Sequence, residues 1–535
     1  MLKTKIKPIL IYILLIIVSA TPLLYYTASN VSISGDYLFH LSRIENIFNN
    51  LKNGIVLPTI DQNNMNGLGY LIDIFYPNIF FYLPAIFRFF LPISIALQIS
   101  VIIYNFIFGL IYIKIITKLF DKNKAICFTF LYLSSYYLFV DLVSRQAISE
   151  YFSALILPLV LLGTIDLIKN NKWKLLYISM TLVVYTHLLS LVAYTALIVA
   201  ILIFNYKEII KNKQIIKNLF KAGICSFITG LAFIIPFLYY FTKEEYFLHT
   251  TKNSILTINT PLDLLYVLIF IVITIAMFIE YNYFSKKINK YFLLSINGFI
   301  FFIYMYSTLC NWEVLSFFKL FQYKIRIGLF TNISLIIILS YILSKRKYII
   351  KLFFITFCAL SFETMLGEIF NETTNKEFEA VEIINKCVFN MDKDAKFDEQ
   401  YCQIVFAEYL PSNLKIEDKL FIESCHEKSI LENSEYLMNI EFEDLEKYKE
   451  KNKYIITTDK QEIVIDKVYY PTYRVSQENN KEINIENYNG FIKISNIKDG
   501  EIILKYGPTP LQYVSFLISI STIFIIIILD KKKIL

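Results

Sequence analysis

Apolar runs of about 20 residues recur along most of this chain of 535 residues. A run of that length is what an α-helix needs to cross the hydrocarbon core of a bilayer. Hydrophobic residues make up 56% of the chain, and charged residues make up only 18%. Soluble domains usually carry roughly 25% charged residues. The sequence therefore predicts a polytopic α-helical membrane protein.

We expect about twelve transmembrane helices. Lys3, Lys5 and Lys7 precede the first one, as in a signal peptide, but its apolar run is longer than a signal peptide needs. We therefore interpret it as a retained anchor. The twelve predicted spans are 8–29, 93–113, 125–141, 150–168, 174–188, 189–206, 221–241, 262–281, 291–309, 327–344, 349–367 and 510–530.

Positive charge is divided unevenly between the predicted loops. Alternate loops, counted from the N-terminus, hold most of the lysines, including the run from Lys207 to Lys221. Cytoplasmic loops of membrane proteins carry such an excess. We therefore expect a multi-pass protein of the cytoplasmic membrane with both termini in the cytoplasm. The net charge of +7 follows from this topology and does not indicate nucleic-acid binding.

Polar stretches suggest three parts. Residues 1–370 are expected to form the polytopic membrane domain, whose first outer loop, 30–92, carries amphipathic helices. Residues 371–508 are expected to form an extracytoplasmic soluble α/β domain. Apolar and polar residues alternate there from about residue 453, with turn signals such as "NYNG", and this pattern predicts a small antiparallel β-sandwich. Residues 509–535 form a C-terminal transmembrane helix with a basic cytoplasmic tail.

Seven cysteines occur without any CxxC spacing, which argues against a zinc or redox motif. Cys387, Cys402 and Cys425 lie in the soluble segment. A disulfide among these three is left open.

The stretch "SGDYLFHLSRIENIFNNLKNG" combines an apolar stripe with a polar face at helical spacing. Asp36, His40 and Arg43 share the polar face. Other unusual polar residues fall at the outer ends of predicted spans, and ionisable groups in such places are costly and often functional. We therefore predict one site on the outer side of the membrane. The other polar residues at these outer ends are Asp61, Asp73, Asp141, Arg145, Glu150, His187, Glu244, Glu245, His249, Glu313, Gln322 and Arg326.

Several motifs carry a resemblance in their order along the chain. They are "GDYLFHLSRI", "GLGYLIDIFYP", "SRQAISEYFSALILPLVLLG", "THLLSL", "FQYKIR" and the late "VYYPTYRV". In this order the chain resembles bacterial membrane proteins named 6-pyruvoyl-tetrahydropterin-synthase-related, which look like the GT-C class of membrane glycosyltransferases. Where relatives often show a "QFPWR"-like string, this chain has "QYKIR" at 322–326. The four histidines are too far apart in sequence to suggest the zinc site of a true pterin synthase.

The resemblance implies transfer of a sugar from a polyprenyl-phosphate donor to a cell-envelope polymer or glycolipid outside the cytoplasm. It also implies a catalytic acid in the first outer loop, which here is Asp36. Some GT-C enzymes use a divalent metal, so a Mg or Mn ion stays open, and no local spacing of ligands indicates one.

The residue types suit this chemistry. Arg43, Arg145 and Arg326 can pair with the leaving phosphate, because guanidinium matches phosphate bidentately. The carboxylate of Asp36 can accept the proton of the acceptor hydroxyl, and one base would invert the anomeric centre. Other residues assigned to substrate binding are His40, Glu150, His187, Gln322, Tyr70 and Tyr76, the two tyrosines as platforms for a sugar ring.

Each residue also has a plainer interpretation. Asp36 can cap a helix, Arg43 can extend to lipid headgroups, and Arg145 can form a structural ion pair with Glu150. His187 can be a hydrogen-bonded packing residue.

Two other functions compete with glycosyl transfer. One is a lipid or solute transporter or flippase, although transporters usually place polar groups near the bilayer midplane. The other is a non-catalytic envelope scaffold whose β-rich domain binds a polymer or a partner.

Overall fold

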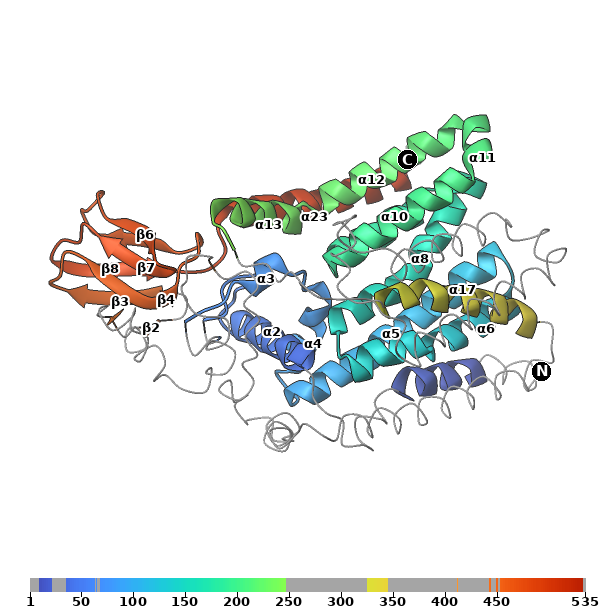
Figure 1. The fold of residues 1–535 in the computed structure, drawn as a ribbon, viewed down its shortest axis with the longest axis horizontal. Helices are drawn as coiled ribbons and strands as arrows, with labels where there is room; N and C mark the ends of the chain where they lie inside the picture. Colours follow the sequence, from blue (N-terminus) through green and yellow to red (C-terminus); the bar gives the residue numbers. More distant parts are fainter. Residues whose placement is uncertain are drawn as a thin grey trace, which may run out of the picture. The chain divides into compact units, whose positions relative to one another are not determined.

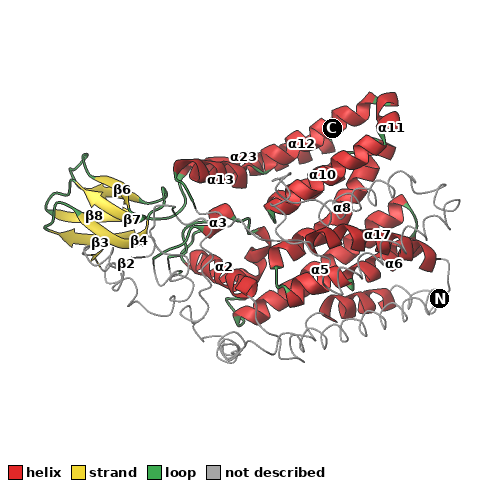
Figure 2. Cartoon of the chain, viewed as in Figure 1, coloured by secondary structure: helices red, strands yellow, loops and turns green. Residues whose placement is uncertain are grey.

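The computed structural model describes residues 9–21, 35–62, 64, 68–246, 325–344, 411, 442–443, 449–450 and 453–532. The chain divides into two compact units. Of the described residues, 9–21, 98–226 and 325–344 belong to the first unit, and 35–97, 227–246 and 442–532 belong to the second. The described elements of the first unit are helices, whereas the β-strands belong to the second (Figure 2).

The helices of the first unit follow the apolar runs of the sequence (Figure 1). Helices α5 and α12 each extend a few residues into the second unit. The elements are α5 (Ile93–Leu119), α6 (Lys122–Leu133), α7 (Tyr136–Phe139), η2 (Val140–Ser144), α8 (Ile148–Asn170), α9 (Lys174–Val184), α10 (Leu188–Phe204), α11 (Tyr206–Lys211), α12 (Lys213–Thr229) and α17 (Ile325–Leu343).

Among the described residues, four helical stretches are long and apolar enough to cross a membrane. They are 93–119, 122–143, 148–170 and 510–531. Shorter apolar helices lie at the predicted spans 8–29, 174–188, 189–206 and 327–344. The predicted spans 262–281, 291–309 and 349–367 lie outside the described residues. A mostly helical protein with candidate membrane spans is thus confirmed, while the number twelve and the orientation stay predictions.

The predicted span 221–241 is bent. Helix α12 ends at Thr229, α13 (Leu231–Lys243) begins after Gly230, and the two helices differ in direction by 65°. The apolar run continues through the bend, so hydropathy alone does not reveal it.

Pro158 lies inside α8 and has no N–H to offer the carbonyl of Ala154, one turn earlier. The hydroxyl of Tyr132, on α6, donates to that carbonyl at 2.6 Å. The hydroxyl of Tyr112, on α5, donates to the next carbonyl, that of Leu155. Two buried tyrosines therefore offset the cost of the proline and tie α5 and α6 to α8.

At Gly163, α8 lies close to the backbone of α9. A Cβ at this position would lie 2.6 Å from the backbone nitrogen of Leu176 and 2.8 Å from its Cα. The chain turns between the two helices at Asn171, which adopts a left-handed conformation with φ 55°. The absent side chain at Gly163 thus sets the spacing of this helix pair.

The second unit begins with α2 (Gly35–Lys52), which confirms the helix predicted over 36–52. Its apolar stripe is buried at Leu41 and Ile44, but its polar face is buried too. Glu45 on α2 pairs with Arg88 at 2.9 Å, in the segment that follows α4. The other short helices here are α3 (Ile72–Phe75), η1 (Ile79–Phe81) and α4 (Tyr82–Phe87).

In the described part of the chain, eight strands form two four-stranded sheets. The strand order is β1-β4-β7-β6 in one sheet and β2-β3-β8-β5 in the other, and buried residues of both sheets share one core. The β1–β4 pair is parallel and the other pairs are antiparallel, so the predicted sandwich is antiparallel apart from one edge. The strands are β1 (Phe442–Glu443), β2 (Lys449–Glu450), β3 (Lys453–Thr458), β4 (Ile463–Val468), β5 (Arg474–Gln477), β6 (Asn484–Tyr488), β7 (Phe491–Ser495) and β8 (Gly500–Lys505).

The "NYNG" turn joins β6 to β7 as predicted. Tyr488 pairs with Phe491, so Asn489 and Gly490 form a two-residue hairpin loop. Both have positive φ, 55° and 90°. Asn-Gly favours such a loop because both residues tolerate the left-handed region.

Ile60 and apolar residues of the segment 68–75 pack into the core of the sandwich. The backbone N–H of Val468 donates to the carbonyl of Leu68 at 2.8 Å. The amide of Gln62 accepts a hydrogen bond from Tyr454 at 2.8 Å and donates one to Tyr473 at 3.0 Å. Part of the segment predicted as the first outer loop is therefore folded together with the C-terminal strands.

Helix α23 (Pro510–Lys531) begins with a capping box formed by Thr509 and Gln512. It lies beside α13 (Figure 1). Ser519 on α23 accepts a hydrogen bond from the backbone N–H of Ala232 at 2.8 Å. That bond satisfies a donor at the start of α13 which has no partner within its own helix.

Replacing Gly163 with Ala should loosen the α8–α9 contact, because backbone atoms cannot move aside as a flexible side chain can. We expect a loss of roughly 1–3 kcal/mol from overpacking. This exceeds the gain of up to about 1 kcal/mol that Ala brings to a helix. Thermal unfolding of the detergent-solubilised protein measures the effect. Gly223→Ala on α12, where a Cβ meets no atom within 4 Å, is the matched control. Equal melting temperatures for the two variants would contradict the assignment.

Candidate functional site

The side chain of Glu150 lies at the centre of a buried ionic cluster in the first unit, at the start of α8. Its Oε1 accepts a hydrogen bond from the hydroxyl of Tyr137 at 2.6 Å. Its Oε2 accepts from Arg145 Nη2 and from Arg326 Nε, both at 2.9 Å. Arg326 comes from the first turn of α17, so one carboxylate joins two cations from distant parts of the sequence.

Asp141 extends the cluster within η2. Its Oδ1 accepts from Arg145 Nη1 at 2.6 Å, and its side chain is 0% exposed. Its Oδ2 receives no hydrogen bond from any side chain or backbone group in the described part of the chain. A buried carboxylate oxygen without a donor is costly and rare in folded proteins. This oxygen is therefore a candidate contact for a substrate.

The backbone around Asp141 is unusual. Residues 140–144 form a π-helical turn, in which the N–H of Arg145 donates to the carbonyl of Val140 at 2.8 Å. Gln146 follows with φ 55°, in the left-handed region, and it is fully buried. π-helical turns and strained non-glycine residues are frequent at functional sites. Here they place Asp141 and Arg145 beside Glu150.

The positive and negative charges of the cluster are equal in number. Two guanidinium groups face two carboxylates, which keeps the burial of four charged groups tolerable. Burial opposes the charge on Arg145, but the carboxylates of Glu150 and Asp141 outweigh it and raise the pKa of Arg145 above its ordinary value. The arginine side chains are 16% and 14% exposed, whereas Glu150 is 5% exposed. An anion therefore has access to the arginines rather than to the acid.

His187 lies at the N-terminus of α10, and it acts as the N-cap. Its Nδ1 accepts a hydrogen bond from the backbone N–H of Ser190 at 3.3 Å and lies 2.8 Å from the hydroxyl of Ser190. The hydroxyl of Ser153, on α8, donates to that of Ser190 at 2.6 Å. A capping Nδ1 must be unprotonated, so the ring proton sits on Nε2. The packing interpretation of His187 is therefore favoured over direct substrate contact.

The residues predicted from the first outer loop lie in the second unit. Arg43 is fully buried and pairs with Asp73 Oδ1 at 3.1 Å. It also donates to the backbone carbonyls of Tyr76 and Pro77, at 3.0 and 2.8 Å. The second oxygen of Asp73 accepts from Asn46 at 2.7 Å. The interpretation of Arg43 as extending to lipid headgroups is wrong, and a role in holding donor phosphate is disfavoured because its donors face partners inside the protein.

Two of the aromatic assignments change. Tyr70 is 2% exposed and belongs to the core shared with the β-sandwich, so it does not present a platform for a sugar ring. Tyr76 is half-buried, and the guanidinium of Arg43 lies 4.8 Å from its ring centre. That face of Tyr76 is engaged by a cation.

His40 is buried, and its ring stacks on Phe81 at 5.2 Å. Asp36 is half-buried in the first turn of α2, a place that suits both helix stabilisation and a site role.

Gln322 lies outside the described residues. The structure thus brings Arg145, Glu150 and Arg326 together in one unit, and Asp36, His40 and Arg43 on one helix in the other.

The structure places two acidic residues in buried ion pairs that the sequence analysis does not predict. Asp141 was one of many polar residues near span ends, and Asp73 was not assigned a role. The signal for Asp141 is its spacing of four residues from Arg145, which suggests a helical ion pair. No group of three or more His, Cys, Asp or Glu in the described part of the chain could hold a metal ion.

No protein-family model matches this chain, and no curated protein matches it. The family resemblance therefore stays an expectation from the sequence motifs.

Replacing Glu150 with Gln should destabilise the first unit, because two partly buried guanidinium groups would lose their shared, buried carboxylate. Breaking a buried ion pair costs about 3–5 kcal/mol. We expect thermal unfolding in detergent to show a large fall, and the double variant Glu150→Gln/Arg326→Gln to recover part of it. Glu208→Gln, at an exposed position on α11, is the control. If Glu150→Gln unfolds like the control, the cluster is not what holds these helices.

Proposed function

We propose that this protein is a membrane glycosyltransferase of the GT-C kind, which transfers a sugar from a polyprenyl-phosphate donor to a cell-envelope acceptor outside the cytoplasm. The main structural support is the pair Arg145 and Arg326, which meet at Glu150 at the N-terminal ends of long apolar helices. A donor whose phosphate terminates a long lipid needs cations at such a boundary. The order of sequence motifs supports the same function.

The phosphate would bind by competing with Glu150 for the two arginines. A guanidinium group carries five N–H donors in a planar fork, and this fork fits phosphate as well as carboxylate. Both arginines are more exposed than Glu150, so an approaching anion meets them first. The negative charge that develops on the phosphate as it leaves would be stabilised by the same groups.

The acceptor hydroxyl requires a base. In the proposed reaction, its oxygen attacks the anomeric carbon while its proton passes to a carboxylate. The bond from that carbon to the phosphate oxygen breaks, and the phosphate keeps the electron pair. The family resemblance assigns the base to Asp36. Within the first unit, Oδ2 of Asp141 is a second candidate, because no described group donates a hydrogen bond to it.

Asp36→Asn and Asp141→Asn separate these two candidates. Asn keeps the shape of Asp but cannot accept the proton, and losing a general base typically lowers a rate 10²–10⁴-fold. We expect one of the two variants to abolish the protein-dependent sugar in the cell envelope, as measured by composition of wall and membrane polymers. Asp459→Asn, at an exposed position in the sandwich, is the matched control.

Membrane insertion and expression of each variant are checked by immunoblot of the membrane fraction. If both variants insert normally and the sugar content stays at the wild-type level, neither carboxylate is the base. If deletion of the whole protein leaves every envelope polymer unchanged, the glycosyltransferase assignment itself fails.

A further inference from the structure

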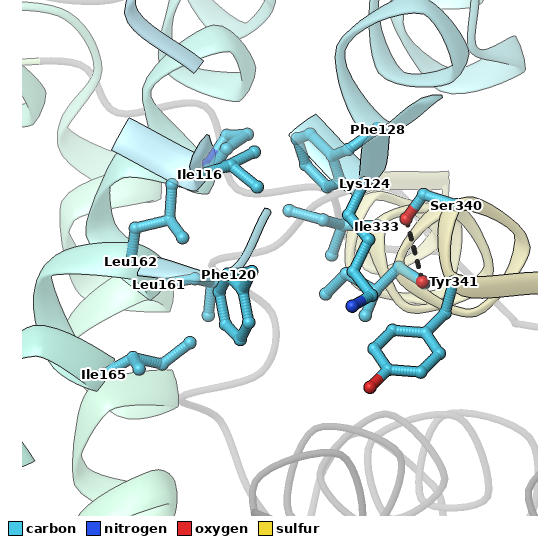
Figure 3. Close-up of a pocket in the computed structure, with 12 residues that line it drawn as sticks. Ile116, Phe120, Lys124, Phe128, Leu161, Leu162, Ile165, Ile333, Ser340 and Tyr341 are labelled. Atoms are coloured by element: carbon cyan, nitrogen blue, oxygen red, sulfur yellow. Dashed lines mark hydrogen bonds between the residues drawn. The ribbon is translucent and has the colours of Figure 1, made fainter. Parts of the chain in front are cut away.

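A second feature of the first unit lies at the other end of α8. An apolar cavity opens between α5, α6, α8 and α17 (Figure 3). Its walls are apolar side chains, apart from Lys124, Ser340 and Tyr341. The lining residues are Ile116, Phe120, Lys124, Phe128, Pro158, Leu161, Leu162, Ile165, Ile333, Ile337, Ser340 and Tyr341.

The cavity is separate from the ionic cluster. The lining residues of α8 run from Pro158 to Ile165, eight to fifteen residues after Glu150, which corresponds to about 12 to 22 Å along a helix. Those of α17 run from Ile333 to Tyr341, seven to fifteen residues after Arg326. Both helices therefore run from the cluster at their N-terminal ends to the cavity in their C-terminal halves. The cavity lies where lysines are frequent, close to the ends of α5 and α8.

Two lysines lie close to aromatic rings that line the cavity. Lys124 Nζ lies 4.3 Å from the ring centre of Tyr341 and pairs with Asp121 at 2.5 Å. Lys169 Nζ lies 5.9 Å from the ring centre of Phe120. The Lys124 side chain is 10% exposed, whereas Asp121 is 42% exposed. Asp121 also caps α6, because its Oδ1 accepts a hydrogen bond from the backbone N–H of Lys124 at 2.9 Å. Another anion at Lys124 Nζ would therefore compete with Oδ2 of Asp121 alone, while the cap stays in place.

We propose that this cavity binds one hydrocarbon chain of an anionic phospholipid, with the lipid phosphate held by Lys124 and Lys169. Basic pockets between membrane helices bind anionic headgroups in this way. The cavity volume is about 60 Å³, well below the roughly 150 Å³ apolar cavity that holds a benzene ring. Only a few methylene groups of the hydrocarbon chain would therefore enter the cavity. The apolar walls exclude a sugar or a free nucleotide.

The test uses the full-length protein in nanodiscs with dioleoylphosphatidylglycerol or dioleoylphosphatidylcholine as the probe lipid. Native mass spectrometry after release counts the lipids that stay bound. We expect the wild type to retain phosphatidylglycerol preferentially. Lys124→Gln should lower that preference about five-fold, since one lysine near a lipid surface contributes about 1 kcal/mol. Ile337→Phe should fill the cavity and reduce retention of either lipid.

Lys118→Gln is the matched control, because Lys118 is an exposed lysine near the same end of α5 that does not line the cavity. An unchanged preference in a folded Lys124→Gln variant overturns the proposal, as does unchanged retention in a folded Ile337→Phe variant. Displacement of the bound phosphatidylglycerol by citronellyl phosphate or undecaprenyl phosphate, at equal concentration, would assign the cavity to the polyprenyl carrier instead and overturn the phospholipid assignment.

Discussion

The three hydrogen bonds to Glu150 are the contacts on which the arrangement of the first unit depends. They join the turn before α8, the start of α8 and the start of α17 at one carboxylate. Removing one partner from such a pair leaves a buried charge, which is far more costly than losing an ordinary contact. Replacing the whole set by apolar residues, in contrast, is often neutral for stability. Stability therefore explains why the partners must stay together, but not why this cluster is ionic at all.

The second unit supplies an informative comparison. Arg43 is 0% exposed, and it donates hydrogen bonds to Asp73 and to two backbone carbonyls of the same unit. A ligand could reach this guanidinium group only by breaking several buried hydrogen bonds. Arg145 and Arg326 are 16% and 14% exposed and share a carboxylate that lies deeper than they do. The same residue type is thus a structural clamp in one unit and an accessible cation in the other.

Local pattern predicted the local elements well. The helix over 36–52, the long apolar helices and the Asn-Gly hairpin follow from spacing and turn chemistry. The local sequence pattern does not predict contacts between residues that lie far apart in the sequence. Arg326 meets Glu150 across 176 residues, and Gln62 meets Tyr473 across 411. Periodicity reports which face of a segment is apolar, but it does not report which segment covers that face. For this reason the sequence pattern assigns Arg43 to the donor phosphate, or alternatively to lipid headgroups, and Tyr70 to a platform for a sugar ring, and it does not reveal that both are buried.

Residues 140–150 have backbone and side-chain features that a structural ion pair does not need. Glu150 and its arginines could be joined from an ordinary helix start, without a π-helical turn and without a buried left-handed Gln146. The left-handed conformation of Gln146 costs of order 1–3 kcal/mol, and π-helical turns are rare. A buried Asp141 oxygen without a donor among the described residues adds a further cost. Three costly or rare features within one short segment are hard to reconcile with a purely structural role, because a simpler helix start would avoid them all. A ligand that donates to Asp141 and bonds to Arg145 would make use of all three at one place, which supports the start of α8 as the proposed functional centre of the first unit.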